Sequence, residues 1–298
     1  MSQGNIIVSG SSGLVGSALV RSLRTDDIGV TRLVRHEPRA VDEVRWDPQQ
    51  PLDPAVLAGA SAVVNLNGAS IGRLPWTGGY RQQLVESRVR STATLAAAIR
   101  QLGRAAPLFV SASAVGYYGD RPGERLTESA SVGDTFLAEL SADWEATALN
   151  VGPDARVALL RTAPILHPQG VLKPLVLLTK LGVSGPLGGG KQIWPWISLT
   201  DEVRAIRHVI DRGLTGPVNL TGPEPASAND IGRAIAAELS RPYVVPAPKW
   251  ALRLALGRDA ADSLLLSDAN VAPEALLESG FEFEHPTVQR AVASALGS

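Results

Sequence analysis

Short apolar runs alternate with longer stretches of helical spacing through the first half of the chain. The runs are rich in β-branched residues and read NIIVS, VTRLV, SAVVNL, PLFVSAS and RVALLR. Strands separated by helices in this way are typical of a parallel sheet whose two faces are both covered. The pattern therefore predicts an α/β fold with a doubly wound parallel sheet.

Two of the intervening segments have a clear helical face. Val15, Leu19 and Leu23 fall four residues apart and form one buried stripe. The longest predicted helix runs from about Tyr80 to Leu102, and its apolar face includes Arg88. Because a charge among apolar residues needs a partner, we expect Arg88 to find one.

The amino-acid composition of the chain changes after about Ala163. Segments rich in Gly and Pro then alternate with segments of helical spacing. One of the predicted helices begins at Asp201, with Thr200 as its cap. We divide the chain into a main α/β part at 1–163, a mixed region at 164–243 and a small helical appendage at 244–298. The mixed region is expected to hold a substrate lid and elements that return to the core, because such segments often lie over the carboxyl edge of a sheet.

A glycine-rich turn follows the first strand, in the run IIVSGSSGLVGSALV. Glycines at this spacing allow a tight turn, close approach of a pyrophosphate to the backbone, and close packing of helix on strand. The free N–H groups and the dipole at the helix start then hold the diphosphate. The alternative is a glycine-rich turn that binds no ligand. The residues predicted to bind the cofactor here are Gly10, Ser11, Ser12, Gly13, Leu14, Val15 and Gly16.

The end of the second strand indicates which dinucleotide binds. Arg35 stands 19 residues after Gly16, where a carboxylate would hold the ribose 2′-hydroxyl of NAD. A cation suits a 2′-phosphate, so the sequence favours NADP(H). Arg35 is alternatively a solvated surface residue, and His36 either assists it or is merely exposed. Asp47 closes the run VRWD, which is the predicted third strand, and it either contacts the adenine or starts a turn.

The run NLNGA leaves the fourth strand at its carboxyl end. A small polar loop there runs beside the nicotinamide ribose in a sheet of this type. We therefore predict that Asn67, Gly68 and Ala69 contact the cofactor, with Asn65 at the strand end. An ordinary Asn/Gly turn is the alternative.

Composition and charge narrow the class of protein. With 28 Lys and Arg against 29 Asp and Glu, the formal net charge of −1 offers no general attraction to nucleic acid or to an anionic membrane. The absence of cysteine excludes disulfides, thiolate metal sites and a cysteine nucleophile. The four histidines show no metal-ligand spacing, so no metal is predicted. No signal peptide or apolar run long enough to span a membrane is visible, so a cytoplasmic location is expected.

Taken with the glycine turn, the runs NLNGA and SASAVGYYG resemble the extended (atypical) short-chain dehydrogenase/reductase superfamily. More narrowly, the chain resembles the NAD(P)-dependent epimerase-like branch of the SDR39U type. The runs that carry this narrower match include PWTGGYRQQLVESRVRST, FLAELSADWEA, GPLGGGKQIWPWISLTDEV and RPYVVPAPKWALRLALG, and they are spread over nearly all 298 residues. The resemblance implies a Rossmann-like, NADP-binding domain at 1–163 and a smaller C-terminal region on the substrate side.

The catalytic residues of that superfamily are only partly present. Its extended members pair a serine on the fifth strand with a Tyr-x-x-x-Lys on the next helix, where the tyrosine is the acid/base. Ser113 matches the serine, because it stands four residues before Tyr117. In the place of Tyr-x-x-x-Lys the chain has Phe136 or Leu137, followed by Leu140 or Ser141.

Other side chains are candidates for the missing roles. Tyr117 and Tyr118 are the nearest phenols, and either of them is an active-site donor or a half-buried packing residue. Lys191 approaches from the lid or is simply exposed. Arg81 and Arg88 bind a cofactor phosphate or an anionic substrate group, or else form helix-surface ion pairs. Of these, Ser113, Tyr117 and Tyr118 are predicted to be catalytic and Arg88 to bind the cofactor.

We therefore expect an NADP(H)-dependent oxidoreductase or epimerase-like enzyme that acts on a carbonyl or carbinol group of a small molecule, with a molecule like a nucleotide sugar as one candidate. The alternative is a catalytically silent NADP(H)-binding sensor, which the loss of Tyr-x-x-x-Lys favours. Neither hypothesis requires nucleic acid or a membrane as a partner. A homodimer through the helix at Tyr80 to Leu102 is an expectation by analogy with the superfamily.

Overall fold

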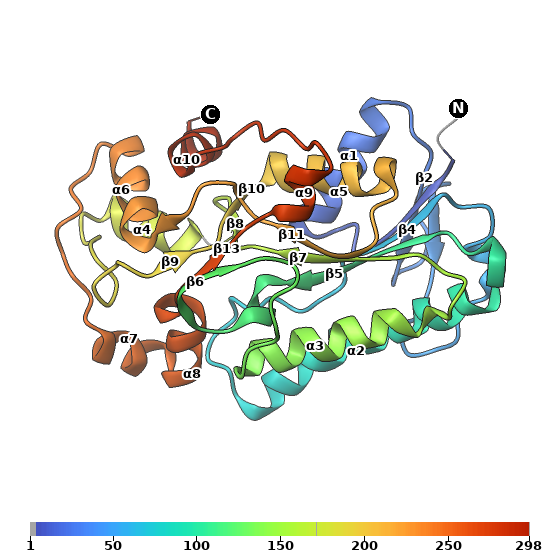
Figure 1. The fold of residues 1–298 in the computed structure, drawn as a ribbon, viewed down its shortest axis with the longest axis horizontal. Helices are drawn as coiled ribbons and strands as arrows, with labels where there is room; N and C mark the ends of the chain where they lie inside the picture. The colour runs from blue at the N-terminus through green and yellow to red at the C-terminus, as the bar shows by residue number, and fades with distance from the viewer. Residues whose placement is uncertain (1–3, 171, 298) are drawn as a thin grey trace.

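A seven-stranded parallel sheet forms the centre of the molecule (Figure 1). The computed structural model describes residues 4–170 and 172–297. The strands of this sheet are β1 (Ile6–Ser9), β2 (Val30–Val34), β3 (Glu43–Arg45), β4 (Ala62–Asn65), β5 (Leu108–Ala114), β7 (Val157–Thr162) and β11 (Gly216–Leu220). They lie in the order β3-β2-β1-β4-β5-β7-β11, and every neighbouring pair is parallel. The predicted doubly wound α/β fold is confirmed.

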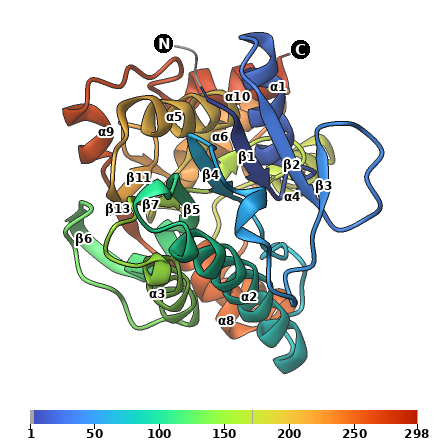
Figure 2. The same cartoon turned by 90° about the vertical axis from the view of Figure 1, so that its right-hand side faces the viewer.

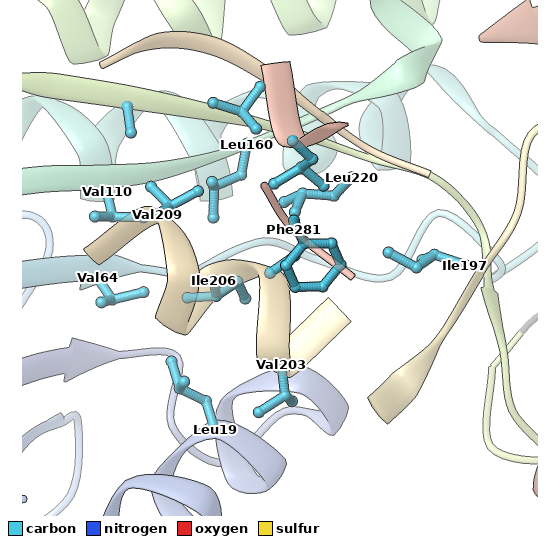
Figure 3. Packing of buried hydrophobic residues seen from close by; sticks show 14 of the residues in the cluster. Leu19, Val64, Val110, Leu160, Ile197, Val203, Ile206, Val209, Leu220 and Phe281 are labelled. Carbon is cyan, nitrogen blue, oxygen red and sulfur yellow. The ribbon is translucent and has the colours of Figure 1, made fainter. Parts of the chain in front are cut away.

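Helices cover both faces of the sheet (Figures 1 and 2). On one face lie α1 (Leu14–Thr25) and α5 (Leu199–Arg212), and on the other α2 (Gly78–Gln101) and α3 (Phe136–Ala148). Side chains alternate along each strand, so Val64 and Leu160 belong to the first core while Val63 belongs to the second. The first core also receives Ile206 of α5, as Figure 3 shows.

Most of the remaining strands and helices lie beyond the carboxyl ends of the central strands and at the β11 edge (Figure 1). Three two-stranded pairs are formed by β6 (Arg121–Leu126) with β13 (Ala269–Val271), β8 (Ile165–Leu166) with β10 (Ile197–Ser198), and β9 (Ile193–Trp194) with β12 (Ala226–Ser227). The helices are α4 (Leu172–Lys180), α6 (Ala228–Glu238), α7 (Lys249–Leu256), α8 (Arg258–Ala261), α9 (Glu274–Glu278) and α10 (Val288–Leu296). Short helical turns are η1 (Pro54–Val56), η2 (Gly103–Ala105), η3 (Val115–Tyr118), η4 (Leu149–Val151) and η5 (Asp262–Leu266).

One predicted helix start is wrong. We expected Thr200 to cap a helix beginning at Asp201, but α5 begins at Leu199 and its cap is Ser198, whose Oγ accepts a hydrogen bond from the N–H of Asp201. The Asp201 carboxylate instead accepts hydrogen bonds from the N–H groups of Glu284 and His285. This side chain therefore ties the C-terminal segment to α5 as well as stabilising the positive end of the helix.

Candidate cofactor and active site

The turn between β1 and α1 has the geometry that its glycines predict. Gly10 adopts a φ of +76°, and a Cβ on it would lie 2.6 Å from the carbonyl carbon and oxygen of Leu66. A Cβ on Gly16 would lie 2.3 Å from the carbonyl oxygen of Gly10. Any side chain at these two positions therefore displaces backbone, and the turn keeps its form only with glycine.

The start of α1 faces this turn without a side-chain cap. Ser12 and Gly13 are exposed, and neither Ser11 nor Ser12 hydrogen-bonds its side chain to another described residue. Backbone N–H groups at an uncapped helix start carry a partial positive charge. The turn also lies where the strand order reverses between β1 and β4, which is where open α/β sheets bind ligands. These residues fit the diphosphate of a dinucleotide.

The segment after β4 lies beside the glycine turn. Asn67 donates from Nδ2 to Ser9 Oγ at 2.7 Å and to Asn65 Oδ1 at 2.8 Å, so its side chain is tied to the ends of β1 and β4. A Cβ on Gly68 would lie 3.2 Å from the Arg88 guanidinium carbon. The structure thus places Leu66 and Asn67 next to the turn, whereas Gly68 and Ala69 lie against Arg88; that they contact a cofactor stays a prediction.

Arg88 is mostly buried and has no acidic partner among the described residues. It donates to the carbonyl oxygens of Leu84 and Ala69, each at 3.0 Å, and its guanidinium lies 5.2 Å from the ring centre of Trp144. Burial lowers the pKa of Arg88 to about 10, although the electrostatic interaction with Tyr80 acts in the opposite direction and raises it. The predicted need for a partner is met by carbonyls and a ring, which leaves the positive charge uncompensated by an anion.

Arg35 and His36 lie just past the end of β2, and both are exposed. Arg35 forms no ion pair with another residue in the described ranges, whereas His36 Nδ1 lies 2.8 Å from the carbonyl oxygen of Glu37. A free guanidinium at this strand end is available to a phosphate.

Ser113, at the end of β5, hydrogen-bonds to a buried ion pair. Its Oγ lies 2.7 Å from Glu145 Oε1, and Arg161 donates from Nε to the same oxygen at 2.8 Å and from Nη2 to Oε2 at 2.9 Å. Ser113 and Arg161 are each 4% exposed and Glu145 is 7% exposed. The structure thus joins a predicted site residue to two residues that sequence reasoning did not select.

The two tyrosines of the following turn differ sharply. The hydroxyl of Tyr118 donates to Asn219 Oδ1 at 2.6 Å and accepts from Arg161 Nη1 at 2.9 Å, and burial raises the pKa of this phenol to about 12. Tyr117 is half-buried with its ring centre 3.6 Å from the Arg161 guanidinium carbon, and its hydroxyl has no hydrogen-bond partner in the described part of the chain. Of the two, Tyr117 has the available hydroxyl.

The helix α3 shows what replaces the expected tyrosine and lysine. Leu137, Ser141 and Glu145 are four residues apart and share one helix face. Leu137 lies against Gly116, the Ser141 hydroxyl donates to the carbonyl oxygen of Leu137 at 2.8 Å, and Glu145 reaches Ser113. Leucine and serine therefore occupy the helix face next to Ser113, and neither side chain is an acid or base near neutral pH.

The C-terminal segment packs onto the start of α2. Trp76, Tyr80 and Leu84 form a small core with Ala260 of α8, and Arg81 makes an ion pair with Asp259. Arg81 therefore forms an ion pair at the protein surface, which is one of the two roles that the sequence left open for it. Lys191 is exposed on the loop before β9, and no hydrogen bond or ion pair of its side chain is recorded there.

The residues that sequence reasoning missed are Glu145, Arg161 and Asn219. Glu145 looks like any helix carboxylate, and Arg161 closes the apolar run RVALLR. Asn219 lies 101 residues from Tyr118 in the chain. Two of these residues could have been found by looking for a polar residue near the end of a buried strand. Arg161 and Asn219 both occupy that position, in the neighbouring strands β7 and β11.

The sheet order, the glycine turn at its switch point and the serine on β5 define a Rossmann-type dinucleotide-binding protein. A family model described as the NAD dependent epimerase/dehydratase family matches residues 6–220, and one described as a domain of unknown function, DUF1731, matches residues 247–295. The chain belongs to the NAD-dependent epimerase/dehydratase family, and within it to the extended short-chain dehydrogenase/reductases of the SDR39U type.

Relatives match the chain along almost its whole length. The epimerase family protein Mb2239 of Mycobacterium bovis is 40% identical, over 99% of this chain and 98% of that protein. The crystal structure of human epimerase family protein SDR39U1 with NADPH has a TM-score of 0.89 at 26% identity, covering 99% of both chains. The nucleoside-diphosphate sugar epimerase of Corynebacterium glutamicum has a TM-score of 0.78 at 32% identity, covering 99% of this chain and 59% of that one.

Two further features concern ligands and membranes. In the described ranges, no group of three or more His, Asp or Glu side chains is placed to hold a metal ion. Of the helices within residues 4–170 and 172–297, none combines the length and apolar content needed to cross a bilayer.

Proposed function

We propose that the protein is an NADP(H)-dependent oxidoreductase or epimerase that acts on a carbonyl or carbinol group of a small molecule, with a nucleotide sugar as the first class to examine. The observation that carries the proposal is the glycine turn. Gly10 and Gly16 leave no room for side chains, and the start of α1 that follows them has no side-chain cap. Such a turn at the switch point of a parallel sheet fits a dinucleotide diphosphate.

The choice of NADP(H) rests on two cations. Arg35 is exposed at the end of β2, where the adenosine ribose of a dinucleotide lies in this fold, and it has no ion-pair partner among the described residues. Arg88 lies beside Gly68 and Ala69, is mostly buried, and has no acidic partner in residues 4–170 and 172–297. We assign the 2′-phosphate to Arg35, with His36 beside it, and a phosphate oxygen of the cofactor to Arg88.

When bound, the nicotinamide supplies hydride exchange with a carbon atom of the substrate. The chain's own residues position the reacting oxygen and handle its proton. Ser113 hydrogen-bonds that oxygen from the end of β5, and Tyr117 is the proton donor or acceptor, because its hydroxyl has no competing partner among the described residues. Tyr118 holds Arg161 and Asn219 in place and stays protonated, since burial raises its pKa to about 12.

A second function is favoured by one observation. Leu137 and Ser141 stand on the helix face where the superfamily has its tyrosine and lysine, and a positioned acid/base contributes about 10²–10⁴ in rate. A chain without that pair is also suited to report the NADP(H) state to a partner without turnover.

Calorimetry with NADPH and NADH on the purified chain tests the cofactor assignment. We expect NADPH to bind roughly ten- to a hundredfold more tightly than NADH, as a charge-assisted contact to the 2′-phosphate provides. No heat with either nucleotide would contradict the proposal as a whole. Equal affinity for the two would remove the assignment of Arg35 while leaving the turn as a dinucleotide site.

Stopped-flow absorbance at the nicotinamide band separates the two functions. The NADPH-loaded protein is mixed with a panel of nucleotide 4-keto-sugars, aldehydes and quinones, and Ser113→Ala is measured beside it. A rate that falls in the Ser113→Ala variant supports the enzyme. Tight NADPH binding with flat traces across the panel, and likewise across the corresponding alcohols mixed with the NADP⁺-loaded protein, supports the sensor instead.

A further inference from the structure

The hydroxyl proton of Ser113 has a defined direction. A serine hydroxyl has one hydrogen and two lone pairs, whereas an ionised carboxylate only accepts. Arg161 donates to both oxygens of Glu145, at 2.8 and 2.9 Å, so both carboxylate oxygens act as acceptors in this bidentate pairing. In the 2.7 Å contact between Ser113 Oγ and Glu145 Oε1, Ser113 must therefore be the donor.

Once that proton is engaged, only lone pairs of Ser113 remain for a ligand. We infer, on the basis of the proposed function, that Glu145 is a positioning residue that makes Ser113 a hydrogen-bond acceptor toward the substrate. The site then selects a hydroxyl group over a carbonyl group at the reacting carbon. The substrate class is an alcohol, and the complex that forms most readily contains the oxidised cofactor.

The burial of the hydrogen bond between Ser113 and Glu145 keeps the Ser113 proton directed at Glu145. All three side chains are buried, with exposed fractions of 4% for Ser113, 7% for Glu145 and 4% for Arg161. Turning the Ser113 proton toward a carbonyl would leave Glu145 Oε1 with Arg161 as its one donor in a site without bulk water. The loss of one such hydrogen bond is equivalent to about a tenfold preference.

Ser111 provides an internal comparison. It lies two residues earlier on β5, on the same face of the strand, and is also buried. Its Oγ is 3.4 Å from the carbonyl oxygen of Ala112 and makes no contact with Glu145. Of these two serines, only Ser113 is oriented by the ion pair, so Ser111→Ala is a matched control.

Neutron diffraction from crystals of the full chain exchanged into D₂O tests the inference directly. We expect the deuterium on Ser113 Oγ to point at Glu145 Oε1, and the Glu145 carboxylate to carry none. A deuterium that points away from Glu145, or one bound to the carboxylate, would overturn the inference. This measurement needs no cofactor, so it remains decisive even where calorimetry shows no nucleotide binding and only the proposed function fails.

Ligand-observed NMR gives the functional readout. The probes are 2-propanol and acetone, which match in size and differ at the oxygen, and no cofactor is added, so neither reacts. We expect the site to prefer 2-propanol about tenfold, the preference to vanish in Ser113→Ala, to return in Ser113→Thr and to be unchanged in Ser111→Ala. Absence of a preference for 2-propanol in the unsubstituted chain, or one that survives in Ser113→Ala, would overturn the inference.

Discussion

The guanidinium of Arg161 on β7 and the carboxylate of Glu145 on α3 form a buried ion pair joined by two hydrogen bonds. The pair contacts Ser113 on β5 and Tyr118 in η3, so it connects four elements at the carboxyl edge of the sheet. Its geometry meets the condition under which a buried pair is tolerated, because both carboxylate oxygens are satisfied and the guanidinium has further acceptors.

Removing one member of this pair is predicted to be costly. Glu145→Ala leaves the Arg161 charge buried without an anion, which lowers the free energy of unfolding by about 3–5 kcal/mol. Urea denaturation followed by circular dichroism measures it. The double variant Glu145→Leu with Arg161→Met buries no charge and should be more stable than Glu145→Ala. A single variant as stable as the parent chain would show that the pair is hydrated in solution.

Arg35 is predicted to determine the choice between NADP and NAD. Arg35→Ala removes the cation at the end of β2, so affinity for NADPH should fall roughly ten- to a hundredfold while affinity for NADH changes little. Calorimetry with both nucleotides gives the ratio. Arg21→Ala is the control, because Arg21 is equally exposed on α1 and changes the net charge by the same amount. Equal losses in the two variants would contradict a specific contact.

Gly16 is predicted to be indispensable to the turn. The Cβ of Gly16→Ala would lie 2.3 Å from the carbonyl oxygen of Gly10, so helix and turn must separate and NADPH affinity should drop below detection. Gly79→Ala is the control, since a Cβ there meets no atom within 4 Å. Binding is measured by calorimetry and folding by circular dichroism. Unaltered NADPH affinity in Gly16→Ala would argue against the turn as the diphosphate site.

The turn was predictable from the sequence because its constraints are local. Gly10, Gly13 and Gly16 follow a strand and open a helix within one continuous run, so spacing alone reports the backbone geometry. The alternation of apolar runs likewise predicted five strands of the central sheet, since a strand buried on both faces is apolar throughout. The strand β11, with the sequence GPVNL, was missed because it has few apolar residues.

The polar network around Ser113 was not predictable in the same way. Ser113 and Glu145 are 32 residues apart, and Tyr118 and Asn219 are 101 residues apart. Each partner belongs to a common residue type, and the contact exists only after β5, β7, β11 and α3 have packed together. The roles of the predicted catalytic residues stay predictions, although the structure distinguishes Tyr117 from Tyr118 by their partners.

Glu202 in the first turn of α5 is predicted to make stability depend on pH. Its Oε1 accepts from Thr162 at 2.9 Å, its Oε2 has no partner in the described chain, and burial raises the pKa of its carboxyl group from 4.5 to about 8. The folded state therefore binds one proton more than the unfolded state between these pH values, so its contribution to stability decreases as pH rises from about 4.5 to about 8.

Thermal denaturation between pH 5 and 8 measures this dependence. Glu202→Gln stays neutral throughout, so its melting temperature should decline less with rising pH than that of the parent chain, and the variant should be the more stable of the two at pH 8. Glu139→Gln is the control, because Glu139 is exposed on α3. Parallel pH curves for the parent and Glu202→Gln would show that this carboxyl group ionises normally.

The two neighbouring tyrosines provide the last prediction. Tyr118→Phe removes the hydroxyl that donates to the buried Asn219 Oδ1, while Arg161 Nη1 keeps the Glu128 carbonyl oxygen as an acceptor, so the free energy of unfolding should fall by about 1–3 kcal/mol. Tyr117→Phe removes a hydroxyl without a partner in the described chain, so its stability should be close to that of the parent. If Tyr117 is the acid/base of the proposed reaction, the same change should lower turnover by about 10²–10⁴. Urea denaturation and stopped-flow measurements on both variants separate these effects. A Tyr117→Phe variant that retains full turnover would show that a group other than Tyr117 is the acid/base.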